Sequence, residues 1–279
     1  MELAEIEALH AQHARADFGT TTPDELAYIQ ETIRTYKPRK ILEIGTASGL
    51  TTGFLARFLE EVGGDSVTSI DSEDVFFGDH RKKVGYLASA IYDGQSVRTR
   101  IEAGKSSLDL AGLDGPWDLV FVDASHNHPW PTLDTLAVAP HLSGARIVIH
   151  HDLQLFRRFP RFLGIGPRVL FNETPQTHRH AGAANGWNIF RIDLSMEPVL
   201  LEEMGLNALS MPWTARPPLS KREVSRFREA LRDTYSPGFW AQFDVCEKQN
   251  RWNATKMAYF YVRYAAAKLR NALLGRSRA

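Results

Sequence analysis

The first two thirds of the chain alternate between short apolar runs and segments whose apolar residues have helical spacing. Apolar runs that predict buried strands occupy residues 40–44, 66–71, 97–104, 117–122 and 145–149, with two further candidates at 168–171 and 187–192. Helical spacing and helix-start signals predict helices at residues 1–16, 23–37, 50–59, 76–92 and 131–142. Residues 172–186 are expected to form a loop. Strands that alternate with helices predict a parallel sheet with helices on both faces, a Rossmann-like, doubly wound α/β fold.

The first predicted strand ends in a Gly-rich turn, residues 43–49, that leads directly into the next helix. Gly45 permits a sharp reversal of the chain, and Gly49 permits close approach of a ligand or of the helix. Ala47 stands where the dinucleotide fingerprint G-x-G-x-x-G has a glycine. Glu43 would repel a pyrophosphate but would suit a ligand with positive charge. The turn therefore favours a cationic cofactor over NAD.

Polar residues gather where the other predicted strands end. They are Asp71, Gly104, residues 123–128 and residues 150–152. The carboxyl ends of parallel strands meet at one edge of a sheet, so these residues and the Gly-rich turn are expected to form one site. Asp71 has the position from which such folds present a carboxylate to a ribose diol. This feature alone does not separate S-adenosylmethionine (SAM) from NAD, because both contain ribose.

The composition narrows the class of protein. Lys and Arg together number 33, and Asp and Glu together number 33. The formal net charge is therefore zero, and no overall positive potential favours the binding of nucleic acid. The single cysteine, Cys246, excludes an intramolecular disulfide and suits a reducing compartment. The acidic start lacks the layout of a signal peptide, and no apolar run reaches the ~18 residues of a membrane-spanning helix. We therefore expect a cytoplasmic protein.

The composition changes after about Ser195, which predicts a first domain at residues 1–195, including the N-terminal helices, and a helical appendage at 196–279. Residues 211–218 are typical of a linker, and Ser220 begins a helix with a capping box. A last predicted helix, residues 254–274, carries aromatic and basic residues but no acid. Such a helix would lie on the anionic inner surface of a membrane, or pack its aromatic face on the core or on a second subunit of a homodimer.

Residues 19–193 resemble the class I SAM-dependent methyltransferases, within them the small O-methyltransferases of the catechol type and of the sugar- and antibiotic-tailoring type. The resemblance rests on the segment 43–49, Asp71, the turn at Gly104, and Asp123 and His126 followed by His151 and Asp152. It implies the strand order 3-2-1-4-5-7-6 with an antiparallel seventh strand. It also implies an acceptor that is a small molecule or a glycan.

The resemblance further implies roles for individual residues. Glu43, Gly45, Thr46, Ser48 and Gly49 would line the methionine side of SAM, with Asp123 beside it. Asp71 would hold the ribose hydroxyls, and Gly104, Lys105 and Ser106 would border the adenine. In metal-dependent members, acids that end the fourth and fifth strands bind a divalent cation. Asp123 and Asp152 match those positions, whereas His151 and Ser125 stand where the family has acids.

Methyl transfer to a hydroxyl needs a base, or a metal that lowers the pKa of the hydroxyl. His126 is the candidate base, with Asp123 and His151 as its catalytic neighbours. Asp123, Asp152 and His151 are the candidate ligands of Mg²⁺ or Mn²⁺. Two other functions remain open from the sequence. One is another nucleotide-binding enzyme, such as an NAD oxidoreductase, and the other is a non-catalytic methyltransferase-like scaffold.

Overall fold

A seven-stranded sheet forms the centre of the molecule, with the strand order β3-β2-β1-β4-β5-β7-β6. The computed structural model describes residues 1–14, 20–158, 163–182 and 188–251, and the single residues Thr255, Ala258 and Val262. The strands are β1 (Lys40–Ile44), β2 (Ser66–Asp71), β3 (Arg98–Ala103), β4 (Trp117–Val122), β5 (Leu142–His150), β6 (Arg179–Ala181) and β7 (Phe190–Asp193). The strands β1 to β5 pair in parallel, and β7 is antiparallel to β5 and β6. The expected Rossmann-like sheet with an antiparallel last strand is confirmed.

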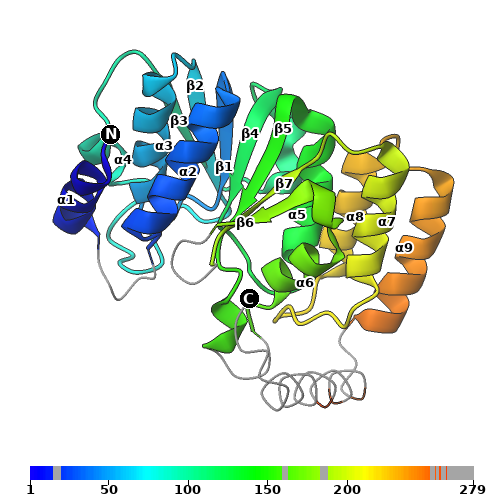
Figure 1. The fold of residues 1–279 in the computed structure, drawn as a ribbon. Coiled ribbons are helices and arrows are strands. Elements are labelled where there is room, and N and C mark those ends of the chain that lie inside the picture. Colours follow the sequence, from blue (N-terminus) through cyan, green and yellow to red (C-terminus); the bar gives the residue numbers. More distant parts are fainter. Residues whose placement is uncertain are drawn as a thin grey trace, which may run out of the picture.

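Helices cover both faces of this sheet (Figure 1). The α-helices are α1 (Leu3–His13), α2 (Pro23–Tyr36), α3 (Leu50–Glu61), α4 (Ala88–Ile91), α5 (Trp130–Val138), α6 (Gly166–Glu173), α7 (Pro198–Leu209), α8 (Lys221–Leu231) and α9 (Pro237–Asn250). Short 3₁₀ helices are η2 (Ser107–Gly112), η3 (Ala139–His141), η4 (Leu155–Arg157) and η6 (Gln176–His178). None of the described helices is long and apolar enough to cross a membrane.

Alternate residues of each central strand enter different hydrophobic cores, as a pleated strand requires. Ile41 and Leu119 belong to the core that α1, α2, α3 and α4 cover. Leu42 and Val120 belong to the core that α5, α7, α8 and α9 cover. The central strands are therefore buried on both faces, which explains why they are nearly continuous apolar runs in the sequence.

The C-terminal helices complete the second core. Leu201 of α7, Phe227 of α8 and Phe239 of α9 are buried in the same cluster as Val120 and Leu136. In Figure 1, α7 lies between α5 and α9. The domain boundary predicted after residue 195 falls in the short connection between β7 and α7. The predicted basic helix at 254–274 lies outside the described residues, except for Thr255, Ala258 and Val262.

The strand predicted at residues 168–171 is wrong, because this segment lies inside α6. A run of four residues has too little periodicity to separate a strand from a buried helix turn. Pro167 in the first turn fits a helix. One helical turn brings Ile165 and Val169 together, and both pack against Ala208 of α7.

The helix predicted at residues 76–92 is also wrong over most of its length, since only α4 is an α-helix there. Gly85 has a positive φ of 78° and donates its N–H to the carbonyl of Ala47 at 2.9 Å. That bond ties the segment to the β1–α3 turn and breaks the helical spacing. Phe76 and Tyr86 then pack on each other over the site.

The loop predicted at residues 172–186 contains η6 and the edge strand β6. Pairing with β7 supplies the backbone partners of β6, and a three-residue strand has no detectable periodicity of its own. The helix predicted at residues 131–142 ends earlier than expected, because α5 ends at Val138, η3 follows it, and β5 begins at Leu142.

Candidate active site

Two adjoining cavities open at the carboxyl ends of the central strands. The first, here called the His126 cavity, has a volume of about 610 Å³. The second, here called the Asp71 cavity, has a volume of about 670 Å³. Both are lined by Gly45, Ala47, Phe77, Asp123 and Ala124, so the cavities meet between the β1–α3 turn and the end of β4. Together they offer an elongated site with two chemically different ends.

The β1–α3 turn lies at the junction of the two cavities. Gly45 and Gly49 have positive φ angles of 98° and 83°. A Cβ atom on Gly45 would lie 2.1 Å from the carbonyl oxygen of Asp123. Thr46 and Ser48 line the His126 cavity. Gly45 thus brings the β1–α3 turn and the β4–α5 loop into direct backbone contact, whereas Gly49 lies against the backbone of Gly85.

Glu43 lies beneath this turn and lines neither cavity. Its Oε2 atom accepts hydrogen bonds from the hydroxyls of Ser69, at 2.5 Å, and Thr52. Burial raises the pKa of Glu43 to about 8 despite these two bonds. Glu43 therefore joins β1, β2 and α3 rather than facing the space in which a cofactor would lie.

Asp71 lines the second cavity at the end of β2. Its carboxylate accepts hydrogen bonds from the backbone N–H groups of Ala47, at 2.9 Å, and Glu73, at 3.0 Å. Ser106 lines the same cavity, whereas Gly104, with a φ of 71°, only forms the preceding turn. Trp130 also lies in the wall, while Trp187 is outside the described residues.

Four side chains converge at the ends of β4 and β5. Asp123, His126, His151 and Asp152 each offer one ligand atom, and these atoms all lie within 4.8 Å of one another. His126 Nε2 lies 3.0 Å from Asp123 Oδ1 and 3.5 Å from Asp152 Oδ2. His126, Asp123 and Asp152 line the His126 cavity, whereas His151 is buried behind them.

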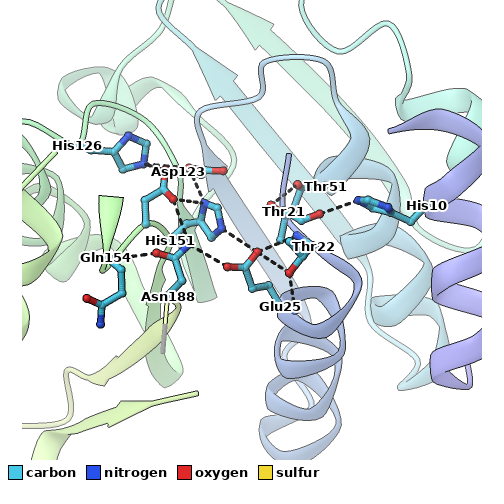
Figure 2. A network of polar contacts seen from close by, with 11 residues as sticks. His10, Thr21, Thr22, Glu25, Thr51, Asp123, His126, His151, Gln154 and Asn188 are labelled. Carbon is cyan, nitrogen blue, oxygen red and sulfur yellow. Dashed lines mark hydrogen bonds and ion pairs between the residues drawn. The ribbon is translucent and has the colours of Figure 1, made fainter. Parts of the chain in front are cut away.

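His151 lies between carboxylates on both of its nitrogens (Figure 2). Nδ1 is 3.2 Å from Asp123 Oδ1, and Nε2 is 3.1 Å from Glu25 Oε2. Burial lowers the pKa of His151, but the charges of Asp123 and Asp152 and these contacts raise it well above its usual value. Burial opposes ionisation of Asp123 as well, yet His151 and His126 hold the pKa of that carboxyl well below its usual range.

Glu25 comes from α2, far from the other site residues in the sequence (Figure 2). It is buried at the N-terminus of the helix, where Thr22 and Glu25 form a capping box. Asn188 donates from Nδ2 to Glu25, at 2.9 Å, and to Asp152, at 3.1 Å. Burial opposes ionisation of Glu25, but the contact with His151 and these hydrogen bonds lower its pKa to about 2.

The cluster fits a divalent cation. Two carboxylates and two imidazoles are a donor set that suits Mn²⁺ and similar metals better than Mg²⁺, which prefers oxygen ligands only. A metal-bound histidine usually donates its other N–H to a carboxylate, and Glu25 stands in that position behind His151. The same atoms without a metal form a hydrogen-bonded network in which His151 carries the positive charge.

Sequence reasoning had missed three residues of the site. Glu25 was visible only as a capping residue, and nothing in its neighbourhood pointed to His151. Asn188 lies in the connection before β7, where a single amide side chain belongs to no repeating pattern of hydrophobic and polar positions. Asp134 is buried on α5 in the wall of the Asp71 cavity, where it accepts a bond from Ser107 at 2.6 Å. Burial raises the pKa of Asp134 to about 7.

Comparison with known proteins independently supports the resemblance to methyltransferases. Residues 42–153 match a family model described as a methyltransferase domain. No curated protein matches the sequence.

Several solved structures are similar to part of this chain at low sequence identity. An O-methyltransferase from Bacillus cereus, in complex with SAH, is 18% identical, with 68% of this chain and 90% of that chain covered and a TM-score of 0.46. SAH-bound PaMTH1 of Podospora anserina is 17% identical, with coverage of 68% and 86% and a TM-score of 0.47. The O-methyltransferase TomG of Streptomyces achromogenes, in complex with SAM, is 20% identical, with coverage of 68% and 87% and a TM-score of 0.46.

The matched segment runs from the first strand to the residue after Asp152, so it contains the Gly-rich turn, Asp71 and the cluster at the ends of β4 and β5. The strand order of the whole sheet is the one that the resemblance implied. Residues 42–153 are therefore similar to a methyltransferase domain, and they lie in a sheet with the strand order that the resemblance to class I, SAM-dependent methyltransferases implied.

Proposed function

We propose that the protein transfers a methyl group from SAM to a hydroxyl of a small molecule or glycan. The carrying observation is the pair of adjoining cavities, one with a carboxylate suited to a ribose diol and one with the Asp123–His126 cluster. SAM, when bound, supplies a methyl group on a positively charged sulfur. Gly45, at the junction, lets the β1–α3 turn approach the backbone of Asp123 closely.

The transfer breaks the bond between carbon and sulfur and forms a bond between the same carbon and the acceptor oxygen. The sulfonium becomes a neutral thioether, and the hydroxyl proton must leave. His126 is the base in this proposal, because it lines the cavity and Asp123 orients its ring. Proximity contributes much of the rate, and a positioned base typically adds ~10²–10⁴-fold.

Asp123, Asp152, His126 and His151 would hold a divalent cation, which would lower the pKa of a coordinated hydroxyl. His126 is then a ligand rather than the base, so the two roles are separable by experiment. His126→Ala is expected to lower kcat by ~10²-fold or more, with the affinity for SAM retained. If His126 is the base, the His126→Ala variant keeps its affinity for Mn²⁺. If His126 is a ligand, the variant loses both kcat and affinity for Mn²⁺. Turnover near the wild-type value would remove His126 from the mechanism.

Isothermal titration with SAM, with NAD as the parallel ligand, tests the cofactor. We expect SAM to bind and NAD not to bind, and Asp71→Ala to weaken SAM. A protein that binds neither ligand would instead be a scaffold with a methyltransferase fold. Aromatic side chains at Phe76, Phe77 and Tyr86 favour a small acceptor with an apolar face, because they line the His126 cavity.

The partners and location belong to the same proposal. The protein is expected in the cytoplasm without a nucleic-acid partner, since its positive and negative side chains balance. The basic segment 254–274 would contact either an anionic inner membrane surface or a second copy of the chain. Co-sedimentation with anionic liposomes should be stronger for the full chain than for residues 1–253, and equal pelleting would end the membrane assignment. Light scattering of the same two proteins tests the homodimer.

A further inference from the structure

The Asp71 cavity is bounded in part by the C-terminal helical region. Glu223 and Arg226 of α8, and Arg216 and Pro217 in the segment before it, line this cavity. All four lie outside residues 42–153, the segment that matches the methyltransferase family model. The wall they form is therefore a feature of this chain that the shared domain does not provide.

A chain of polar contacts runs from α8 into the cavity. The guanidinium of Arg226 lies 2.7 Å from Asp109 Oδ1, across elements that are 117 positions apart in the sequence. The other oxygen of Asp109 accepts bonds from the backbone N–H of Ser106, at 2.9 Å, and from its hydroxyl, at 3.0 Å. The next residue, Ser107, donates to Asp134. Arg226 thus holds the acid that shapes the Ser106–Ser107 turn.

The segment before α8 is fixed to the β4–α5 loop, which also contributes to the lining of this cavity. The backbone N–H groups of Thr214 and Ala215 both donate to the carbonyl of His128, at 2.7 Å and 2.8 Å. The hydroxyl of Thr214 accepts a bond from the N–H of His128 at 3.1 Å. His128 lies in the β4–α5 loop that also carries His126. The C-terminal region is therefore bonded both to the β4–α5 loop and to the turn at Ser106.

The orientation of SAM follows from its chemistry, and this step rests on the proposed function. The sulfonium would face Asp123, which lines both cavities where they meet. With the ribose at Asp71, the base would extend toward Ser106, Trp130 and Asp134, which line the Asp71 cavity. We propose that α8 is a wall of the cofactor site and that Arg226 is a positioning residue for the base-binding turn. The C-terminal helices then contribute to cofactor affinity and not only to the core.

Arg226→Met tests this inference, with Arg228→Met as the matched control. Arg228 lies on the same helix but pairs with Asp244 of α9 and lines neither cavity. We expect Arg226→Met to weaken the binding of S-adenosylhomocysteine and of free adenosine by the same factor, roughly 10-fold, as expected for loss of one charge-assisted contact. Steady-state kinetics should show a higher KM for SAM with kcat within about 2-fold, since the reacting atoms lie at the other end of the site.

A double-mutant cycle with Asp109→Asn isolates the pair, because the two single losses should not add if both act through one contact. The melting temperature of each variant shows whether the protein still folds. Adenosine affinity unchanged in Arg226→Met, or lowered equally in Arg228→Met, would overturn the inference. If the wild-type protein binds neither adenosine nor S-adenosylhomocysteine, the proposed function itself fails, and the two failures are thereby distinguished.

Discussion

His151 illustrates how a single buried residue depends on two distant carboxylates. Its two nitrogens contact Asp123, directly after β4, and Glu25 on α2. An imidazole with acceptors on both sides has a fixed ring orientation, whether it carries two protons or binds a metal through Nδ1. Glu25 is itself held by Asn188, which also bonds Asp152. The position of the cluster thus depends on Glu25 and Asn188.

Glu25→Gln should weaken Mn²⁺ binding by ~10–100-fold, as loss of a residue behind a metal ligand usually does. Titration calorimetry with Mn²⁺, and the absorption spectrum with Co²⁺ as the metal, are the measurements. Glu61→Gln is the control, since Glu61 also bonds α2, through Arg34 and Gln30, but lies outside the site. Equal Mn²⁺ affinity in the wild type and Glu25→Gln would show that Glu25 does not position His151.

Glu43 should give the protein an unusual dependence of stability on pH. Its pKa is about 8 when folded, above the 4.5 of an exposed carboxyl, so the folded state binds the proton more tightly. The stability linked to this group is full below about pH 4.5 and is lost as the pH rises through about 8. We therefore expect Glu43→Gln to melt at a higher temperature than the wild type at pH 8.5, and the difference to vanish near pH 5.

Glu61→Gln is the control in the same experiment, because folding lowers the pKa of Glu61 whereas it raises the pKa of Glu43. Burial disfavours the charge of Glu61, but contacts with the N-terminal amine, Arg34 and Gln30 lower its pKa. Its linked stability is present at neutral pH, so Glu61→Gln should melt no higher than the wild type at pH 8.5. A Glu43→Gln protein that gains nothing at pH 8.5 would mean that Glu43 is ionised without cost in the folded state.

At the scale of elements, the site depends on the contact between the β1–α3 turn and the β4–α5 loop. A hydrogen bond reinforces this contact, since Asp123 donates its N–H to the carbonyl of Ile44. The N–H of Gly45 bonds the carbonyl of Ile70 and so fixes the turn to β2. The junction of the two cavities lies at that contact. A side chain at Gly45 would therefore move the catalytic loop as well as strain the turn.

Gly45→Ala should lower both stability and cofactor affinity, because the added Cβ would lie 2.1 Å from the carbonyl oxygen of Asp123. Gly63→Ala is the matched control: its φ of 74° is also positive, but a Cβ there meets nothing within 4 Å. We expect the control to cost about 1 kcal/mol from the left-handed backbone alone, with cofactor affinity unchanged. Equal losses in both variants would mean that the close approach at Asp123 has no consequence.

At the scale of the whole molecule, the C-terminal helices and the sheet share one core. Phe227 and Phe239 are each about 1% exposed in the cluster that contains Val120 and Leu136. Removing α7, α8 and α9 would expose this face of the sheet and of α5 to water. The apolar surface so exposed is far larger than soluble monomers normally tolerate.

A truncated chain of residues 1–195 should therefore aggregate or melt without a cooperative transition, whereas residues 1–251 should melt cooperatively. Differential scanning calorimetry and near-ultraviolet circular dichroism of both proteins check this expectation. A cooperative transition in 1–195, with the near-ultraviolet spectrum retained, would show that the first 195 residues fold alone, as a separate domain would.

The strands that form the sheet centre were predictable because burial on both faces makes them continuous apolar runs. The capping boxes at Thr22 and Ser220 were equally readable, because each depends on residues three positions apart. The segment at residues 76–92 was not, since a bond between Gly85 and Ala47 overrides its local preference for a helix. The edge strand β6 was missed for a similar reason, because its partner β7 supplies its hydrogen bonds.

By itself, the sequence determined the fold class, the strand order through a family resemblance, and the residues at the ends of β1, β2, β4 and β5. The fold class and the site residues follow from periodicity and from the rule that parallel strands end at one edge, whereas the strand order follows from the resemblance alone. Only the tertiary structure joined Glu25 and Asn188 to His151, and α8 to the cavity at Asp71. Such contacts link residues that are far apart in the chain. A local pattern of hydrophobic and polar positions does not encode which distant side chain will pair with a buried charged group.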